Sequence, residues 1–387
     1  MSDTFETVTK QGYFQRISKS IGGVFFGIIL FLASFGVLFW NEGRADYSKI
    51  AETSVPVQAE SQPEAQMQGK FVSTTGKLTT DETIGDQMFL IPGNYLSLHR
   101  NSEMYAWEET SHSETQKNVG GSETTKTTYT YNKKWTSSPS SSSSFKKPQG
   151  HENPPKTINS ETFKANNGKL GVFEVNVKSL DLPGTENLTI TKEMIFPEVF
   201  NQGINLVSGY LYKGSGSLEN PQIGDIRISY NALKSGVDGT IFAKIDGNKL
   251  VSFTNKDNKS MFRMLTGDRE SAIQQLKTEH KIWTWVLRGA GFIMMLAGLS
   301  MIFAPISVVL DFIPIFGSIS RGLIGFVIFI VSFILSGLTI LISILVHNII
   351  YLIIFGGILF IGILIILGIV GVLVLKNKDK LVAGKQS

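Results

Sequence analysis

The chain has 387 residues, of which 42% are hydrophobic and 18% are charged, and its net charge is +4. Lys and Arg are spread along the chain and form no Arg-rich stripe, so nucleic-acid binding is not indicated. Without cysteine the chain has no disulfide, thiol nucleophile or cysteine metal ligand. Apolar residues gather near the N-terminus and in the C-terminal part, while the middle is rich in Thr, Ser, Asn and Gly.

The first apolar run, Ile21 to Trp40, contains no charged residue. A hydrocarbon core about 30 Å thick needs about 20 apolar residues in a helix. The run therefore predicts a membrane-spanning helix over residues 21–40 that follows a short cytoplasmic N-terminus, residues 1–20. No small-residue cleavage site follows it, so we expect the segment to be retained as an anchor.

The polar middle, residues 41–282, has the signals of a β-rich domain. Residues 240–245 and 249–253 resemble two strands joined by a tight turn at Asp246-Gly247-Asn248. Alternating β-branched residues predict further strands at 172–178, 188–191 and 225–230. The Ser/Thr-rich segment 110–144 is too polar to favour ordering and predicts a mobile loop or hairpin tip, except for a strand at 129–135.

Three more apolar runs follow, at 283–304, 323–346 and 349–375. The last two are separated by His347-Asn348, and one helix through both would be far longer than a bilayer is thick, so we expect the chain to reverse there. The approach to the first of these runs, residues 268–283, lacks Pro and Gly and predicts a helix that enters the membrane without a break. The sequence thus predicts four spans.

Basic residues at the two ends of the chain predict the orientation of these spans. Lys10, Arg16 and Lys19 precede the first span, and Lys376, Lys378, Lys380 and Lys385 lie in the tail, residues 376–387. Because such residues favour the cytoplasmic side, we expect both ends in the cytoplasm and residues 305–322 as a cytoplasmic or interfacial loop. The predicted fold is an α-helical membrane protein carrying a β-rich α+β extracytoplasmic domain, which would be periplasmic in a bacterium or luminal in a eukaryote.

Linear signatures of catalysis are absent: we find no G-x-S-x-G, no phosphate-binding loop of the G-x-x-x-x-G-K type and no H-E-x-x-H. The polar cluster His151-Glu152-Asn153 allows a metal or hydrolase site as one interpretation. A structured turn before Pro154 is favoured, because the neighbouring sequence shows no partner ligands. We therefore predict no catalytic, metal-binding or cofactor-binding residues and no enzymatic activity.

In the segment Glu103 to Glu108, a strand would place Glu103, Tyr105 and Trp107 on one face. That face would be either a ligand or partner surface or, as aromatic residues in strands favour, part of an edge or barrel strand with buried rings. A short Ile-Gly-Asp block occurs twice, at 84–86 and 223–225, each time after a Gly-x-Leu, which leaves an internal repeat open.

Two features concern the membrane segments. Asp311 lies in a stretch broken by Pro314 and Gly317, where it would be either hydrated in an interfacial loop, the favoured interpretation, or part of an ion or proton path. Small residues spaced four apart suit close helix packing, within one bundle or between copies, and they are Gly23 with Gly27 and Ser332 with Ser336.

Five blocks occur in the order found in the transmembrane protein 43 family, also called LUMA, which the chain resembles over nearly its whole length. The family-like positions are Glu42, Gly43 and Arg44; Tyr105 and Trp107; Trp135; His151, Asn153 and Pro154; and Gly224, Asp225 and Arg227. The resemblance implies one span before and three after the soluble domain. It also implies a role in organising membrane protein complexes without established catalytic residues.

For eukaryotic members the resemblance implies the endoplasmic reticulum or inner nuclear membrane and association with lamins and emerin. For bacterial members it implies the inner membrane, where those partners do not exist. We interpret the chain as a non-enzymatic multi-pass scaffold without a cofactor, with membrane lipids, membrane proteins of unknown identity and further copies of itself as partners. The alternative is an ion or lipid conduit that uses the C-terminal bundle and Asp311.

Overall fold

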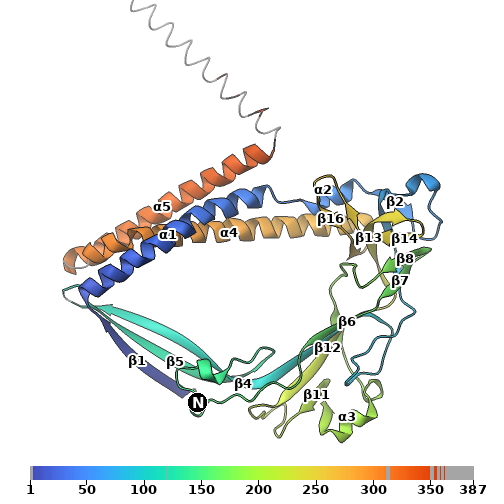
Figure 1. The fold of residues 1–387 in the computed structure, drawn as a ribbon, viewed down its shortest axis with the longest axis horizontal. Coiled ribbons are helices and arrows are strands. Elements are labelled where there is room, and N and C mark those ends of the chain that lie inside the picture. Colours follow the sequence, from blue (N-terminus) through green and yellow to red (C-terminus); the bar gives the residue numbers. More distant parts are fainter. Residues whose placement is uncertain are drawn as a thin grey trace, which may run out of the picture. The chain divides into compact units, whose positions relative to one another are not determined.

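The computed structural model describes residues 3–118, 120–310 and 314–348, together with positions 353, 354, 358 and 361; for residue 310 and residues 314–321 it describes the backbone alone. The chain divides into two compact units (Figure 1). The β-rich unit comprises Met1–Lys10, Asp46–Lys117 and Glu123–His280. The helical unit comprises Gln11–Ala45, Asn118–Ser122 and Lys281–Ser387.

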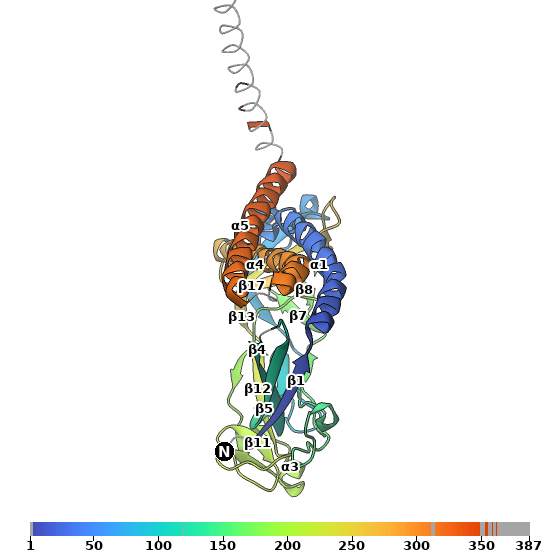
Figure 2. The same cartoon turned by 90° about the vertical axis from the view of Figure 1, so that its left-hand side faces the viewer.

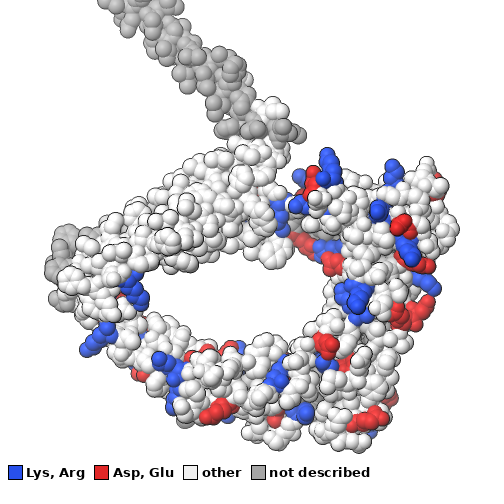
Figure 3. Space-filling model, viewed as in Figure 1, with Lys and Arg blue, Asp and Glu red and all other residues white. Residues whose placement is uncertain are grey.

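Three helices in the described part of the chain are long and apolar enough to cross a membrane. They are α1 (Tyr13–Glu42), α4 (Arg269–Leu310) and α5 (Pro314–His347). These helices contain the predicted spans 21–40, 283–304 and 323–346. On the face shown in Figure 3, charged side chains lie over the β-rich unit and near the helix ends, while the surface of the helices between them is uncharged. The predicted fourth span, 349–375, the tail 376–387 and Asp311 lie outside the described residues, apart from four isolated positions.

The helix α4 begins at Arg269 and continues without a break into the apolar segment, as the sequence predicts. The described residues of the expected loop, 305–322, are helical. At its start, α4 continues through Pro305 to Leu310. The helix α5 already begins at Pro314, a position where the missing N–H of proline costs nothing. Gly317 lies inside α5 and does not interrupt it.

The helices α1, α4 and α5 pack against one another within the helical unit (Figure 2), and a glycine of α1 lies at one of their contacts. A Cβ atom added at Gly27 of α1 would lie 2.7 Å from the Cβ of Met301 and 2.9 Å from the carbonyl oxygen of Gly298 in α4. Gly23, one turn earlier, has no such neighbour within 4 Å. Of the predicted pair, Gly27 therefore lies at a contact within the chain and Gly23 does not.

Ser332 and Ser336 of α5 are both buried, and Ser336 donates its hydroxyl to the carbonyl oxygen of Phe333. Near them, an apolar cluster joins the three helices and consists of Leu38, Met295, Leu299 and Ile328. The small residues of α5 thus face other parts of the same helical unit, as the interpretation of packing within one bundle requires.

We predict that Gly27→Leu destabilises the packing of α1 on α4, whereas Gly23→Leu has almost no effect. Overfilling a close-packed contact costs about 1–3 kcal/mol, and the Gly27 contact includes backbone atoms that cannot rotate away. Thermal unfolding of the two full-length variants in mild detergent, followed by circular dichroism, tests this. Equal midpoints for both variants would contradict the predicted contact.

The first sheet of the β-rich unit has eight strands in the order β1-β5-β4-β12-β11-β10, with β6 pairing to β4 and β9 to β12. Its strands are β1 (Asp3–Gln11), β4 (Tyr95–Lys117), β5 (Glu123–Thr136), β6 (Glu161–Lys164), β9 (Glu186–Leu188), β10 (Ile204–Val207), β11 (Tyr210–Lys213) and β12 (Ile226–Lys234). The predicted strand at 225–230 is β12, and β9 overlaps the one expected at 188–191 at Leu188 alone.

The second sheet has seven strands, and the pairings of five of them, β3-β13-β14-β8-β7, close into a ring. The strands are β2 (Val55–Gln58), β3 (Phe71–Thr79), β7 (Asn167–Leu170), β8 (Phe173–Asn176), β13 (Val237–Asp246), β14 (Lys249–Val251) and β17 (Arg263–Thr266). The predicted hairpin is confirmed: Asp246 pairs with Lys249, and Gly247 has a φ of +64° that suits a tight turn. The strand expected at 172–178 is β8.

Short elements complete the β-rich unit. They are the helices α2 (Tyr47–Glu52) and α3 (Pro197–Asn201), the strands β15 (Phe253–Thr254) and β16 (Ser260–Met261), and the 3-10 turns Ala65–Met67, Ser142–Ser144 and Lys192–Met194. One core cluster lies against the first sheet around Leu98, Met104 and Ile228, and a second belongs to the ring of strands around Phe173 and Ile241. Alternate residues of each strand supply these cores, as the two-residue period of a strand requires.

Of the two alternatives for the segment 110–144, the structure has the hairpin and not the loop, because β4 and β5 pair regularly from Met104–Thr136 to Lys117–Glu123. Threonine favours strands, and its hydroxyls pair across this hairpin, with 3.0 Å between Thr115 and Thr125. The strand β1 lies along the outer edge of β5, where Glu6 and Lys126 form a 2.9 Å ion pair. Pairing between strands thus orders a polar segment that has little apolar surface to bury. The strand expected at 129–135 lies within β5.

Candidate functional site

Side chains from four neighbouring strands, β5, β4, β12 and β11, meet on one face of the first sheet, around Arg227 of β12. Arg227 lies opposite Glu103 of β4, and its Nε is 2.8 Å from Glu103 Oε2. Tyr105 of β4 lies opposite Trp135 of β5, with 5.3 Å between the ring centroids. The Arg227 guanidinium lies over the Trp135 ring at 4.7 Å and over the Tyr210 ring at 5.2 Å. We call Glu103, Tyr105, Trp135, Tyr210 and Arg227 the Arg227 cluster.

The Arg227 cluster is neither buried nor fully solvated. The side chains of Arg227 and Glu103 are 25% and 22% exposed, and the three rings are also partly exposed. Each cation–π contact of this kind contributes about 0.5–2 kcal/mol, depending on desolvation. The rings and the ion pair hold the guanidinium in one orientation, so the cluster presents a fixed cationic and aromatic surface.

Asp225, just before Arg227, organises the loop beside the cluster. Its buried carboxylate accepts backbone N–H groups from Ser215, Gly216 and Gln222 at 3.0, 3.1 and 2.7 Å, and it accepts the hydroxyl of Tyr212. Burial and the neighbouring Asp225 carboxylate raise the pKa of Tyr212, so its hydroxyl remains a donor. Asp225 therefore fixes the start of β12 and, with it, Arg227.

Gly224 allows β12 to meet β4 at this point. Its N–H donates to the Tyr105 carbonyl at 2.9 Å, and the Tyr105 N–H donates to the Asp225 carbonyl at 2.8 Å. Gly224 has a φ of +95°, and a Cβ there would lie 2.8 Å from Cγ of Pro154. A side chain at position 224 would thus meet both backbone strain and Pro154.

Asn153 replaces a missing strand neighbour on β4. Pairing between β4 and β12 reaches Met104, and three residues further on Asn153 Oδ1 accepts the Trp107 N–H at 2.7 Å. Asn153 Nδ2 donates to the Trp107 carbonyl at 2.9 Å. The side-chain amide therefore makes the two hydrogen bonds that a further strand would make, and it fixes the position of Trp107.

His151 is buried beneath this region and is 1% exposed. Its ring stacks on Tyr131 at 3.8 Å and meets Trp107 edge-on at 4.7 Å. Nδ1 lies 2.9 Å from the Lys147 carbonyl, and Nε2 lies 3.1 Å from a carboxylate oxygen of Asp3. Both ring nitrogens thus face acceptors within the protein, an arrangement that fits the structured-turn interpretation.

Within the described ranges of the chain, no group of three or more His, Cys, Asp and Glu side chains could hold a metal ion. Near His151, burial and the hydrogen bond to Glu109 raise the pKa of Tyr131 to about 12. The Tyr131 hydroxyl therefore stays protonated, donating to Glu109 at 2.6 Å and accepting the Lys147 N–H at 2.9 Å. These groups hold the turn in place on β5.

Four of the five family-like blocks meet here, namely those of Tyr105 and Trp107, of Trp135, of His151 to Pro154, and of Gly224 to Arg227. The sequence places Glu103, Tyr105 and Trp107 on one face of a strand, and this is their arrangement in β4. Only the register of β4 against β5 and β12 brings Trp135 and Arg227 beside them.

The fifth family-like block lies in the helical unit, at the end of α1. Glu42 accepts two hydrogen bonds from Arg288 of α4, each 2.8 Å long, and its side chain is 7% exposed. The guanidinium of Arg44 lies 3.5 Å from the Thr284 hydroxyl. A Cβ at Gly43 would lie 2.2 Å from Nε2 of His347. Glu42, Gly43 and Arg44 thus join α1 to α4 and α5.

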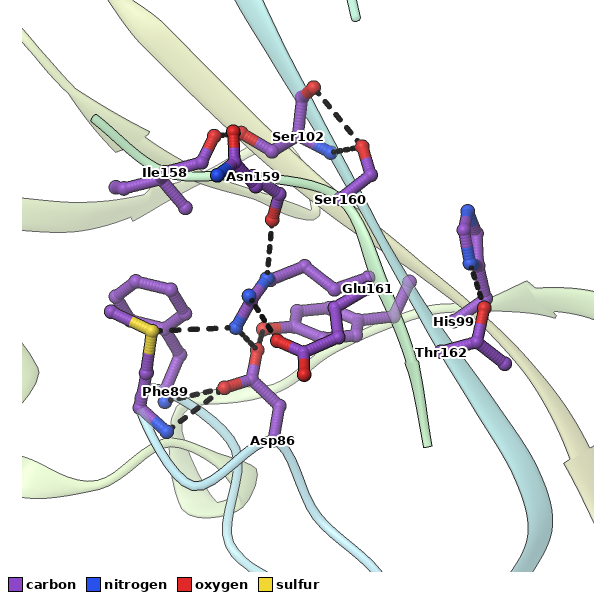
Figure 4. Close-up of polar contacts among 12 residues, drawn as sticks. Asp86, Phe89, His99, Ser102, Ile158, Asn159, Ser160, Glu161 and Thr162 are labelled. Atoms are coloured by element: carbon purple, nitrogen blue, oxygen red, sulfur yellow. Dashed lines mark hydrogen bonds and ion pairs between the residues drawn. The ribbon is translucent and has the colours of Figure 1, made fainter. Parts of the chain in front are cut away.

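A buried ion pair that is not among the predictions from the sequence joins Arg100 of β4 to Asp86, and Figure 4 shows Asp86 with its neighbours. Arg100 and Asp86 are 2% and 0% exposed, and their charged groups are 2.9 Å apart. Asp86 Oδ1 accepts the Met88 and Phe89 N–H groups, and Oδ2 accepts the Tyr230 hydroxyl. Burial and the Asp86 carboxylate raise the pKa of Tyr230, so its hydroxyl stays protonated.

The signal that could have revealed this anchor is the repeated Ile-Gly-Asp, whose two carboxylates, Asp86 and Asp225, are both buried and multiply hydrogen-bonded. The preceding Gly-x-Leu motifs differ, because Leu78 belongs to β3 whereas residues 216–218 lie outside any strand. The two blocks thus share a buried, hydrogen-bonded aspartate, but the secondary structure that precedes this aspartate differs between them.

Comparison with known proteins identifies a matching family. The family model described as Transmembrane protein 43 matches residues 104–349. The chain is 27% identical to Transmembrane protein 43 of Homo sapiens over 328 residues, covering 80% of this chain and 81% of that protein. It is 26% identical to the Transmembrane protein 43 homolog of Drosophila melanogaster over 288 residues, covering 71% and 75%.

Transmembrane protein 43 of Rattus norvegicus is 27% identical over 323 residues, covering 79% of each chain. No solved structure matches the chain. The matched region begins in β4, at the start of the first of the converging blocks, and extends past the end of α5. The chain belongs to the transmembrane protein 43 family.

Proposed function

We propose that the protein is a non-enzymatic membrane scaffold whose β-rich unit binds other membrane proteins through the Arg227 cluster. One observation carries the proposal: four family-like blocks converge on a partly exposed face that combines Trp, Tyr and Arg. These three residue types dominate the binding energy of protein interfaces. The face is held by β4, β5 and β12, so binding there would not first have to order a loop.

The proposal includes four membrane spans, with both chain ends in the cytoplasm and the rest of the β-rich unit, Asp46–Lys117 and Glu123–His280, on the opposite side, an orientation that excludes the pairing of β1 with β5. The basic residues around the first span and in the tail support this orientation. Depending on the host, the membrane would be a bacterial inner membrane, or the endoplasmic reticulum or inner nuclear membrane. Lipids and further copies of the chain would be additional partners.

Because the chain has no cysteine, single cysteines can report this orientation without background. We expect an impermeant maleimide to reach Lys169→Cys from the extracytoplasmic side, and Lys19→Cys and Lys380→Cys from the cytoplasmic side. Pairing of β1 with β5 requires both strands on one side, and Glu6 lies 3.5 Å from Thr128 across that pair. A disulfide between Glu6→Cys and Thr128→Cys in native membranes would contradict a cytoplasmic N-terminus.

We predict that Arg227→Ala and Trp135→Ala reduce the recovery of cross-linked partners from native membranes by about tenfold. That factor corresponds to about 1.4 kcal/mol, the loss expected for one interface anchor. The matched control is Arg263→Ala, since Arg263 is also partly exposed and pairs with Asp181 and Glu279 but lies in β17. Quantitative mass spectrometry after cross-linking measures the recovery, and hydrogen exchange of the β-rich unit reports folding.

The scaffold proposal fails if the wild-type protein yields no cross-linked partner. The assignment to the Arg227 cluster fails if Arg227→Ala and Arg263→Ala lower recovery equally, because the loss would then reflect general stability. A selective loss in the Arg227 and Trp135 variants, with unchanged hydrogen exchange, supports both.

A further inference from the structure

An apolar groove lies between α1 and α5 within the helical unit and has a volume of about 520 Å³. Its lining residues are Phe35, Gly36 and Phe39 of α1 and Leu335, Leu338, Thr339 and Ile342 of α5. The Thr339 hydroxyl donates to the Leu335 carbonyl at 2.7 Å and is thereby satisfied inside its own helix. The groove therefore offers a partner an apolar surface on which the one hydroxyl is already hydrogen-bonded.

The groove leads toward the end of α5. Ser343 donates to the Phe39 carbonyl at 2.8 Å, and Gly43 faces His347, so α1 and α5 run in the same direction with their C-terminal ends level. The helix α5 ends at His347, and the apolar run of residues 349–375 begins immediately afterwards. With so short a connection, an apolar helix that reverses there must lie next to α5, about 8–10 Å from its axis.

We propose that the groove between α1 and α5 is the docking site of residues 349–375 of the same chain. This inference rests on the proposed fourth span, and it specifies which two helices that span packs against. At 1.5 Å per residue, an antiparallel helix would bring about the ninth residue after Asn348 to the level of Gly36 and Leu338. The sequence has Gly356-Gly357 there, where the absence of side chains permits close approach to Phe35 and Phe39.

Both the groove and the segment 349–375 have exposed apolar side chains, which supports an occupant from this chain. Ile342 and Leu338 of the groove are 54% and 48% exposed, and the described positions Ile353, Ile354 and Ile358 are 52–68% exposed. Without a partner, both surfaces face lipid alone, and in a bilayer helices associate through close packing and not through escape from water. The short connection keeps the segment beside the groove at a high effective concentration, which a partner from another molecule lacks.

The test uses the full-length protein in native membranes and the absence of native cysteine. Gly36→Cys is combined with one cysteine at each position from 353 to 360, and disulfide formation is measured after mild oxidation. Nothing lies within 4 Å of a Cβ at Gly36, so this cysteine fits. We expect cross-linking that recurs every three to four positions, is strongest near Gly356-Gly357, and exceeds that of Gly22→Cys about tenfold. Gly22 has equally open surroundings but lies about 21 Å away along α1.

Three outcomes would overturn the assignment. Cross-linking to Ile293→Cys, on the exposed side of α4, in place of Gly36→Cys would place the segment elsewhere in the bundle while retaining the fourth span. Cross-linking found only between differently tagged copies would make a second molecule the occupant of the groove. Labelling of Lys380→Cys from the side of the β-rich unit would show that the fourth span itself is absent.

Discussion

Replacing Arg100 by methionine is expected to lower the free energy of unfolding of the β-rich unit by about 3–5 kcal/mol at neutral pH. The substitution keeps most of the apolar stem but removes the cation from a carboxylate that is 0% exposed. Arg100 also donates from Nε to the Asn159 carbonyl at 2.9 Å and pairs with Glu161 at 2.9 Å. Removing it leaves the buried Asp86 carboxylate with its hydrogen-bond donors but without a neighbouring positive charge. Hydrogen exchange of amides in β4 and β12 measures the loss in the full-length protein.

The same variant should regain stability as the pH falls. Burial raises the pKa of Asp86 above 3.8, against the lowering by Tyr230 and Arg100. A carboxyl group whose pKa is higher in the folded than in the unfolded state stabilises the fold when the pH lies below its unfolded-state pKa. This stabilisation is lost as the pH rises through its folded-state pKa. Without Arg100 the folded pKa should rise further, so the difference from wild type should shrink toward pH 4. A loss that is independent of pH would argue against an uncompensated Asp86 charge.

Two control variants separate the loss of this pair from the loss of any ion pair. Lys169→Met breaks a 3.1 Å pair with Asp81, in which both side chains are more than half exposed, and should cost less than about 1 kcal/mol. Asp86→Asn keeps an acceptor for the Met88 and Phe89 N–H groups and should fall between the two. If Arg100→Met costs no more than Lys169→Met, the buried pair does not anchor β4.

Removing the side chain of Arg288 is expected to destabilise the helical unit by about 2–4 kcal/mol. Arg288 is 22% exposed and makes both of its carboxylate hydrogen bonds to Glu42, whose side chain is 7% exposed. In Arg288→Ala, the Glu42 carboxylate would keep the Asn41 amide as a donor, at 3.2 Å. The cost lies below that of a wholly buried pair because water reaches part of the guanidinium. Thermal unfolding in mild detergent measures it.

The matched control for Arg288 lies on the same helix. Lys277→Ala removes a 2.7 Å pair with Glu52, in which both side chains are nearly half exposed, and should cost less than about 1 kcal/mol. The double reversal of Glu42→Arg with Arg288→Glu should recover part of the loss, because the two sites are directly coupled. Equal losses in Arg288→Ala and Lys277→Ala would refute a special role for this pair in joining α1 to α4.

Predictions from the sequence succeed where a property repeats along a continuous segment. Length and apolarity are sufficient for the spans 21–40, 283–304 and 323–346, because each helix satisfies its own backbone hydrogen bonds. The hairpin at Asp246-Gly247-Asn248 is equally local, since the turn residues fix the register of its two strands. For the segment 110–136 the sequence is a poorer guide. Its polar composition indicates how little apolar surface it can bury, whereas its ordered strands result from hydrogen-bonded pairing with neighbouring strands.

The candidate site depends on contacts between residues that are far apart in the sequence. Glu103 and Arg227 are separated by 124 positions, Asp86 and Tyr230 by 144, and Trp107 and Asn153 by 46. A linear pattern identifies each residue type but contains no information on strand register, which decides whether two side chains meet. Similarly, Gly23 and Gly27 are equivalent in the sequence, and only the crossing of α1 with α4 makes Gly27 the contact.

The sequence by itself determined the class of this protein: a chain with apolar helices at both ends and a β-rich middle, whose ordered blocks indicate the transmembrane protein 43 family. The tertiary structure decided which of those blocks form a single surface and which hold helices together. The physical reason is that apolar runs and turns act over a few neighbouring residues. The Arg227 cluster and the pairs Asp86–Arg100 and Glu42–Arg288 exist only once strand register and helix packing bring distant residues together.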